Sequence, residues 1–329
     1  MEGRKVLGEI SEAEVFPPFE NPSEITVEQW TSSPLRRNLK MLNMVTSSGD
    51  VELDKAANVK TEKEVTGGYA KRRKISEVNL SRVCITPRSP KWELKDTGEW
   101  AARNISDWKV SEGNKTVHMK RKYTPEDLAT AHALIRVLKG TFGQQTPLSG
   151  FRADYSMAFR QNPTHPDQAD ITMEAYYDVT DGPTLLETYG QPFGGKGSQF
   201  NYIRDPEAMC AIARTWRAML MSHYSDDAWN IETQTTAERA YHLWLELNQL
   251  IGWKIDMEKS PPPQGLMRLL GAHIVLNTPT PTSYLADIKA QHLQEECRRH
   301  LRLQIVTSSD AASLRGKMGH ARTFEWGHS

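Results

Sequence analysis

Three aspartates in the sequence could, if brought together, supply the carboxylates for a phosphoryl-transfer site. Asp154 lies in an apolar and aromatic stretch, and Asp226 and Asp227 follow Tyr224 and Ser225 further along the chain. Carboxylate oxygens are the ligands that Mg²⁺ prefers. Two such ions, roughly 3.5–4 Å apart, clamp the attacking and leaving oxygens of a phosphoryl transfer. The three aspartates therefore predict a two-metal site, provided that neighbouring strands bring them together.

The elements around these aspartates decide whether they can meet, since an Asp-Asp pair taken alone is usually a turn or a cap. Apolar spacing, capping residues and turn signals predict alternating strands and helices. A short strand–turn–strand carrying Asp226 and Asp227 between two helices would form a split βαβ arrangement of the ferredoxin-like type. The predicted elements are a strand over 82–86 ended by Pro87, a helix over 124–140 capped by Thr124, a hairpin over 171–189, a helix running to Met221, a helix over 235–252, strands over 269–276, and helices over 284–303 and 309–323.

The composition bounds the class of protein. The 329 residues leave room for about two domains. Lysine plus arginine equals aspartate plus glutamate at 41 each, so only the basic runs 71–74 and 120–122 suggest phosphate contacts, with solvated loop charge as the alternative. Three widely spaced cysteines form neither a disulfide framework nor a zinc-ligand pattern, which favours an intracellular location, nucleus and cytoplasm being indistinguishable. No apolar run reaches 18 residues, so no membrane partner is expected.

The tetrapeptide Tyr224-Ser225-Asp226-Asp227, downstream of the lone Asp154, resembles the catalytic palm of reverse transcriptases. This resemblance implies that Asp154, Asp226 and Asp227 are catalytic and hold two Mg²⁺ ions, with Mn²⁺ as an alternative. It also implies that Tyr224 lies against the substrate. A later stretch, 251–260, resembles the fourth palm motif of the family, in which Lys259 would protonate or neutralise pyrophosphate; a surface lysine is the alternative.

The residues that follow Asp154 resemble the first palm motif of the same family. The aromatic Phe159 stands five residues after the aspartate, and Asn162-Pro163 follows. In the family this aromatic residue stacks beneath the sugar and excludes a 2′-hydroxyl, so the implied substrates are deoxynucleotides. Tyr155, next to the aspartate, is implied to contact the substrate as well.

The glycine-rich stretch 191–200 resembles the second palm motif, whose glycines let the backbone approach the template–nucleotide pair closely. The resemblance implies substrate contacts for Phe193, Gly194 and Lys196. Phe193 departs from the retroviral Leu-Pro-Gln-Gly pattern, and Pro-Phe-Gly is associated with retrotransposons of the tyrosine-recombinase type. Without this context, a stretch rich in glycine is more often a simple turn.

Residues 103–109, together with Asn114, resemble the fingers motif Arg-x-x-x-Asp-aromatic-Lys. Arg103 would grip the triphosphate of the incoming nucleotide with its planar donor fork. Arg88 and Lys91 are both open as the second triphosphate contact.

The resemblance covers roughly residues 60–325 and implies an α+β chain with the right-hand polymerase fold, which has a ferredoxin-like palm, interleaved fingers and a truncated helical thumb. The expected division is a polar, partly disordered N-terminal region over 1–60, fingers over 61–150, a palm with an embedded fingers hairpin over 151–276, and a partial thumb over 277–329.

The implied function is that of a retroelement RNA-directed DNA polymerase, which extends a primer on an RNA or DNA template with dNTPs. Two alternatives stay open. The short thumb, the missing RNase H domain and the departure at Phe193 fit a catalytically inactive retroelement fragment that binds nucleic acid. An RNA-dependent RNA polymerase is the other alternative, against which Phe159 argues. The oligomeric state is open as well.

Overall fold

The structure is a computed structural model that describes residues 3–95 and 98–322. The chain divides into two compact units that are interleaved in the sequence. Unit 1 comprises Met1–Leu94, Trp100–Thr124 and Met157–Asp205, and unit 2 comprises Lys95–Glu99, Pro125–Ser156 and Pro206–Ser329. The units are interleaved because the strands that pair in each unit come from distant parts of the chain.

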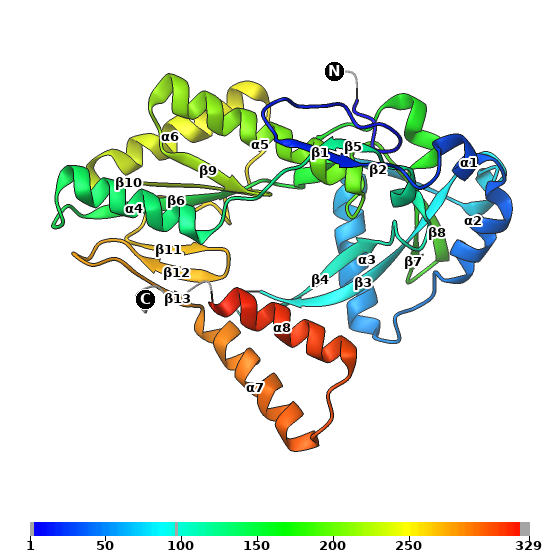
Figure 1. The fold of residues 1–329 in the computed structure, drawn as a ribbon. Coiled ribbons are helices and arrows are strands. Elements are labelled where there is room, and N and C mark those ends of the chain that lie inside the picture. The colour runs from blue at the N-terminus through cyan, green and yellow to red at the C-terminus, as the bar shows by residue number, and fades with distance from the viewer. Residues whose placement is uncertain (1–2, 96–97, 323–329) are drawn as a thin grey trace. The chain divides into compact units, whose positions relative to one another are not determined.

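Unit 1 is built on a five-stranded sheet whose strand order is β2-β8-β7-β3-β4. The pairing of β3 with β7 is parallel, and the other pairings are antiparallel. The elements of this unit, shown in Figure 1, are β1 Pro18–Asn21, α1 Val27–Thr31, α2 Pro34–Asn43, α3 Val51–Thr66, β2 Ala70–Arg73, η1 Ile75–Glu77, β3 Ile85–Leu94, β4 Trp100–Ser106, η2 Gly113–Thr116, β5 Met119–Arg121, η3 Ala158–Gln161, η4 Pro166–Ile171, β7 Met173–Asp178 and β8 Gly182–Thr188.

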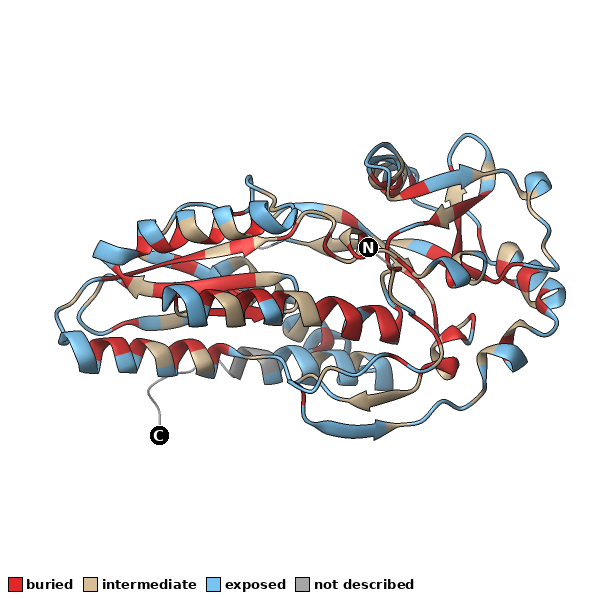
Figure 2. Cartoon of the chain, turned by 90° about the horizontal axis from the view of Figure 1, so that it is seen from above, coloured by how far each residue is buried: buried red, intermediate tan, exposed pale blue. Residues whose placement is uncertain are grey.

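The core of unit 1 lies between this sheet and the helices of the N-terminal region. Met41 of α2 packs with Ile85 of β3 and Leu185 of β8, and Ala57 of α3 packs with Ala102 of β4. Buried residues, red in Figure 2, follow the inner faces of such helices and strands. The hairpin predicted over 171–189 is present as β7 and β8.

Two expectations for unit 1 differ from the structure. Pro87 does not end its strand, because pairing of β3 with β7 covers residues 85–87 and pairing with β4 begins at Arg88. Proline lacks a backbone N–H, and this is tolerated at the point where β3 changes from pairing with β7 to pairing with β4. The N-terminal region, expected to be partly disordered, instead contributes Val6, Leu7 and Ile10 to the buried core.

Unit 2 contains two three-stranded sheets, with the strand orders β6-β10-β9 and β11-β12-β13. The first order, with α6 following β10, matches the split βαβ connectivity predicted around Asp226 and Asp227. The elements of this unit are α4 Leu128–Phe142, β6 Leu148–Asp154, β9 Met221–Tyr224, β10 Asp227–Thr233, α6 Gln234–Ile251, β11 Leu266–Leu269, β12 Ala272–Val275, β13 Thr282–Leu285, α7 Asp287–Leu303 and α8 Ser308–Arg322, together with α5 Lys196–Arg217, which begins in unit 1.

The two faces of the β6-β10-β9 sheet are covered by different elements. Leu148 and Trp229 lie on one face and pack with α4 and with the second sheet. Phe151 lies on the opposite face, where its ring meets that of Tyr241 from α6 at a centroid distance of 5.3 Å. Because strand side chains alternate between faces, this packing fixes which residues of β6 and β10 share a face.

The start of α4 differs from the prediction. Thr124 is not the cap; the Asp127 side chain accepts a hydrogen bond from the Ala129 N–H, and the helix begins at Leu128. Aspartate is as good a cap as threonine, so the motif alone did not separate them. Among the described residues, no helix is long and apolar enough to cross a membrane.

Candidate active site

Asp154 and Asp227 are direct neighbours across two strands of unit 2. In the antiparallel pairing of β6 with β10, the Cα of Asp227 is opposite the Cα of Asp154. Residues opposite each other point to the same face, with Cβ atoms about 4.5–5.5 Å apart. Backbone pairing therefore brings Asp154 and Asp227 together, although they are far apart in the sequence.

Asp226 lies in the tight turn that joins β9 to β10. Tyr224 pairs with Asp227, so Ser225 and Asp226 form a two-residue hairpin loop. Ser225 has a left-handed backbone with φ of 52°, which is uncommon for a residue other than glycine. Asp226 is exposed at this turn, and Tyr224 shares the face of Asp227 and is also exposed.

Positively charged side chains accompany both carboxylates. Lys259 Nζ lies 3.0 Å from Asp154 Oδ2 and 2.8 Å from Asp256 Oδ2. Arg152, from the strand of Asp154, lies 3.6 Å from Asp227 Oδ1 through its Nε. Burial alone would lower the pKa of Lys259, but its hydrogen bonds to Asp256 and Asp154 raise it above the usual lysine range.

The carboxylates fit a divalent cation in donor chemistry and in backbone placement. Mg²⁺ is usually held by one or two carboxylates together with waters and substrate phosphates, which a strand pair bearing two aspartates can supply. Across the described residues, however, no three carboxylate, imidazole or thiol side chains converge as a metal cluster. The carboxylates of Asp154 and Asp227 are paired instead with Lys259 and Arg152.

A buried histidine contacts the backbone of the turn that bears Asp226. His223 of β9 contacts the Ser225 carbonyl through Nδ1 at 3.4 Å and Glu207 Oε2 through Nε2 at 3.1 Å. Arg214 donates to the other oxygen of Glu207 at 2.8 Å. The hydrogen bond from His223 holds the pKa of Glu207 below its usual range. Sequence analysis missed this support, because α5 and β9 show no spacing signal that pairs Glu207 with His223.

Tyr155 is not placed as a substrate contact. Its side chain is buried, 3% exposed, and its ring packs edge-on against Trp253 at a centroid distance of 5.1 Å. Alternation along the strand explains this difference, since the residue after Asp154 points to the opposite face.

Unit 1 holds the aromatic and basic residues that were predicted to bind the nucleotide. Phe159 stacks on Tyr202 at a centroid distance of 4.7 Å and meets Phe193 edge-on at 5.4 Å. The guanidinium of Arg103 lies 4.7 Å from the centre of the Phe193 ring, and Arg103 Nη1 pairs with Glu93 at 2.7 Å. Phe159, Phe193 and Arg103 thus form one contiguous group in this unit.

The glycine-rich loop beside this group is held by Asn114. The Asn114 side chain accepts a hydrogen bond from the Lys196 N–H at 2.8 Å and donates to the Gly194 carbonyl at 3.3 Å. Gly194 has φ of +95°, and a Cβ there would lie 2.6 Å from the Ser106 carbonyl oxygen. The close approach of the Ser106 backbone therefore requires glycine at this position, whereas the predicted approach to a template–nucleotide pair stays a prediction. The Lys196 side chain is exposed.

Arg88 is unsuited to the triphosphate role that the sequence left open for it. It is 7% exposed and paired with Glu64 and Glu174 inside unit 1. Lys91 is exposed on β3, opposite Arg103 of β4, and so stays the candidate for the second triphosphate contact.

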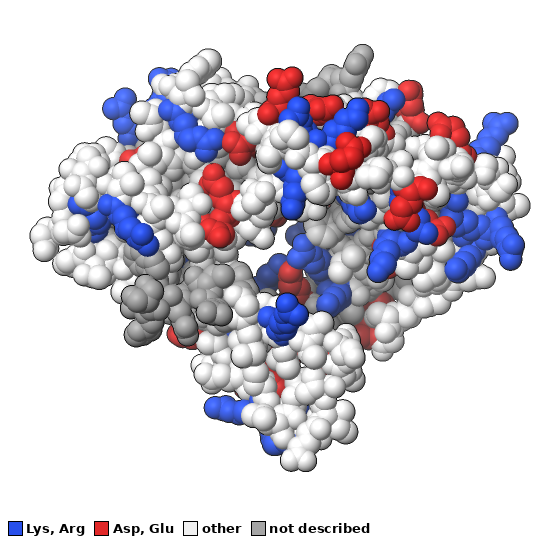
Figure 3. Space-filling model, in the orientation of Figure 1, with Lys and Arg blue, Asp and Glu red and all other residues white. Residues whose placement is uncertain are grey.

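The basic runs are largely paired with acidic side chains. Arg73 bonds Glu187 at 2.8 Å, and Lys120 pairs with Glu9 at 2.5 Å. Figure 3 shows blue and red side chains interspersed over much of the visible face. These contacts favour solvated surface charge over a continuous phosphate-binding stripe for much of the two runs.

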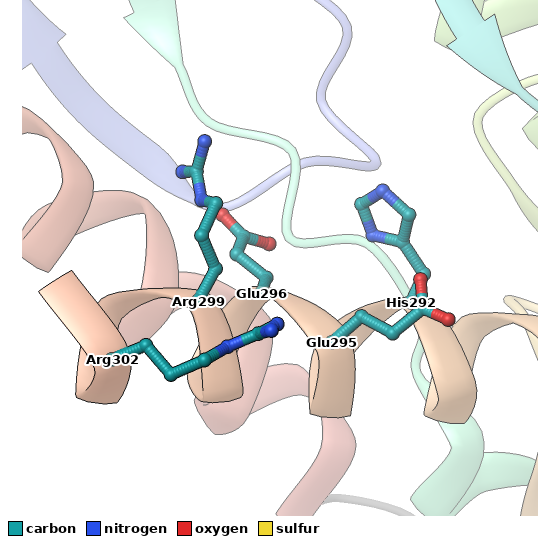
Figure 4. Close-up of a pocket in the computed structure, with 5 residues that line it drawn as sticks. All are labelled: His292, Glu295, Glu296, Arg299 and Arg302. Atoms are coloured by element: carbon teal, nitrogen blue, oxygen red, sulfur yellow. The ribbon is translucent and has the colours of Figure 1, made fainter.

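A shallow hollow of about 530 Å³ lies along α7 in unit 2 (Figure 4). Both basic and acidic side chains line it, and Glu296 is bonded to Lys317 of α8 at 2.6 Å. Because both signs of charge are present, the hollow shows no preference for an anionic ligand. The lining residues are His292, Glu295, Glu296, Arg299 and Arg302.

Comparisons with known proteins locate the fold. No family model and no curated protein matches the sequence. A foamy viral protease-reverse transcriptase in complex with double-stranded DNA matches with a TM-score of 0.56 at 18% identity, over 83% of this chain and 41% of that chain. The same viral protein with an RNA/DNA hybrid matches with a TM-score of 0.53 at 18% identity, over 83% and 31%. A further double-stranded DNA complex has a TM-score of 0.50 at 16% identity, over 97% and 57%.

The chain therefore spans less than two thirds of the length of each of these solved chains. Mixed helices and strands, with structural neighbours of this kind, show an α+β chain with a reverse-transcriptase-like fold.

Proposed function

We propose that this chain is the polymerase part of a retroelement reverse transcriptase, with Asp154, Asp226 and Asp227 as the metal-binding catalytic residues. The observation that carries the proposal is the cross-strand pairing of Asp154 with Asp227 next to the turn that bears Asp226. The likeness in fold to a reverse transcriptase supports it independently of these side chains. In this proposal the β6-β10-β9 sheet serves as the palm, and α7 and α8 serve as the start of the thumb.

The residues of the chain have separate roles in the proposed reaction. Two Mg²⁺ ions, when bound, would stabilise the attacking primer 3′-hydroxyl and the leaving pyrophosphate. Asp154 and Asp227 would exchange their present partners, Lys259 and Arg152, for this cation charge. Lys259, released from Asp154, would hold a proton for the leaving pyrophosphate.

The nucleotide would be recognised by the group in unit 1. Arg103 would bind the triphosphate, and Lys91, opposite it on β3, would add a second positive charge. Phe159, stacked on Tyr202, presents a rigid ring that would exclude a 2′-hydroxyl, so dNTPs are the proposed substrates and an RNA or DNA primer–template the partner.

Primer extension on an RNA template with dNTPs tests the proposal. The purified chain should incorporate dNTPs only when Mg²⁺ or Mn²⁺ is present, and Asp154→Asn should lower the rate by roughly 10³-fold or more. Asp256→Asn is the matched control, since Asp256 also pairs with Lys259 but is outside the proposed ligand set. Salt-sensitive binding of primer–template without any incorporation by the wild-type chain would contradict the enzyme and indicate a binding protein.

A further inference from the structure

Four charged side chains are buried together in unit 1. Arg88, Arg160, Glu64 and Glu174 are between 0% and 7% exposed. Two positive and two negative charges cancel within the cluster. They come from four separate elements, β3, η3, α3 and β7, so the cluster joins the sheet to α3 and to the segment that follows Asp154.

The two arginines share the same carboxylates. Arg160 Nη2 lies 3.1 Å from Glu174 Oε1 and 3.0 Å from Glu64 Oε2. Arg88 pairs with both Glu64 and Glu174, the latter at 3.3 Å. Burial alone would raise the pKa of Glu64, but Arg160 and Arg88 lower it below the usual glutamate range. Removing one partner of such a pair is strongly destabilising, because the other charge stays buried.

Arg160 differs from Arg88 because its Nη1 hydrogen-bonds backbone carbonyls as well. Arg160 Nη1 donates to the carbonyls of Gly190 and Gln191, at 3.4 and 3.3 Å, where the glycine-rich loop begins. The backbones of the two segments are also in contact, since Asn162 O accepts the Gln191 N–H at 2.8 Å. A Cβ on Gly190 would lie 2.2 Å from the Arg160 carbonyl oxygen, so the position requires glycine.

The residue before Arg160 is the aromatic residue proposed to face the sugar. Phe159 contacts Phe193 of the same loop, at a centroid distance of 5.4 Å. Arg160 therefore connects the chain segment that carries Phe159 to the loop that carries Phe193, while its guanidinium is paired with Glu64 and Glu174. A guanidinium can serve carboxylates and carbonyls at once because its five donors diverge in a plane.

We propose that Arg160 is a positioning residue that holds the Phe159 ring and the 190–195 loop rigidly together. By fixing these two groups, it sets the discrimination between deoxynucleotides and ribonucleotides. The inference about sugar discrimination rests on the proposed polymerase function, whereas the locking of the loop does not. The ammonium of a lysine at this position could not satisfy both sets of partners.

Amide hydrogen exchange on the intact chain tests the lock without any reaction. In Arg160→Lys, the Gln191 amide should exchange at least about tenfold faster than in the wild type, because local opening of the loop becomes easier. Arg88→Lys is the matched control, with the same burial and the same carboxylates but no bond to the loop carbonyls among those described. Gly190→Ala leaves all four charges in place and should raise the exchange rate of the Gln191 amide in the same way. This variant replaces Arg160→Lys in the experiment if Arg160→Lys does not fold.

Equal exchange at Gln191 in Arg160→Lys, Arg88→Lys and the wild type would overturn the lock. The second measurement is the ratio of kcat/KM for a dNTP to that for the matching rNTP in primer extension. This ratio should fall about tenfold in Arg160→Lys and stay unchanged in Arg88→Lys. An equal fall in both variants would show a general loss of packing and overturn the specificity role. A wild-type chain that incorporates no nucleotide would remove the proposed function, while the exchange result would still decide the lock.

Discussion

At the scale of single residues, two of the three proposed catalytic carboxylates have a cationic neighbour. Lys259 pairs with Asp154, and Arg152 approaches Asp227. A protein without bound metal would otherwise hold two carboxylates of like charge side by side on one strand pair, which is unfavourable. Lysine and arginine therefore stabilise the same backbone arrangement that a divalent cation would use.

Replacing Lys259 by methionine should lower kcat of dNTP incorporation by roughly 10²-fold, the usual contribution of a positioned proton donor. Primer–template affinity should change little, because methionine keeps an apolar stem of similar length. Single-turnover kinetics and a binding titration separate the two quantities. Lys254→Met, a change in the same segment, is the control. A Lys259→Met chain with the wild-type kcat would show that Lys259 is only a surface ion-pair partner.

At the scale of elements, the aspartate turn depends on contacts with α5. Glu207 of α5 holds His223, which in turn contacts the Ser225 carbonyl. Ser225 adopts a left-handed backbone, which costs energy and persists only when neighbouring groups determine it. The placement of Asp226 thus depends on a helix that is separated from the hairpin by several residues of chain.

Glu207→Gln should lower the free energy of unfolding by about 1 kcal/mol at pH 7, because a charge-assisted hydrogen bond is lost. The pKa of Glu207 is lowered in the folded chain, so its contribution is complete above the ordinary glutamate value of 4.5 and is lost as pH falls through the lower folded value. The difference between wild type and variant should therefore shrink below pH 4.5. Urea unfolding at pH 7 and at pH 4 measures it, and a difference that grows at acid pH would contradict this reading.

Two glycines on helices of unit 2 should respond to alanine with opposite signs. Gly252 ends α6 with φ of 84°, a conformation that costs alanine about 1 kcal/mol, although space is available around it. Gly140 lies inside α4, also in open space, so alanine there should stabilise by about 0.5–1 kcal/mol. Thermal unfolding of Gly252→Ala and Gly140→Ala, compared side by side, checks both signs; a shift in the same direction would refute the helix-end argument.

These elements also show what the sequence could predict. The end of α6 at Gly252 and the hairpin of β7 and β8 followed from local signals, because caps and turns are decided by neighbouring residues. No local sequence signal predicted the pairing of Arg160 with Glu64. A glutamate in a polar helix is expected to face solvent, and Glu64 is buried only because α3 packs against the sheet. For the site, the Asp154–Asp227 neighbourhood was predicted by resemblance, whereas the burial of Tyr155 follows from strand alternation, which the resemblance did not take into account.

At the scale of the whole molecule, the fold is similar to that of a foamy viral protease-reverse transcriptase, although the sequence identity is only 18%. A fold can persist at such low identity because packing tolerates many apolar substitutions that keep volume and pattern. The net charge of zero agrees with the extensive pairing of acidic and basic side chains on the surface. Long-range electrostatic attraction of nucleic acid by the whole chain is therefore expected to be weak.

Primer–template binding should nevertheless weaken linearly on a log–log plot against salt, with a slope near 0.9 for each phosphate contact. Lys71 and Lys74 are exposed, so replacing both by alanine should reduce the slope by about two if they contact phosphates. Arg73→Ala should change it less, because Arg73 is bonded to Glu187. Fluorescence anisotropy at several salt concentrations measures the slopes, and identical slopes for all variants would exclude the 71–74 run from the interface.

Binding of Mn²⁺ in the presence of a dNTP, followed by electron paramagnetic resonance, tests the shared carboxylate site most directly. The wild type and Asp256→Asn should bind the ion with the same affinity, while Asp154→Asn and Asp227→Asn should each weaken binding by at least about tenfold. Undiminished Mn²⁺ affinity in both Asp154→Asn and Asp227→Asn would show that these two residues, neighbours across β6 and β10, do not share a metal ion.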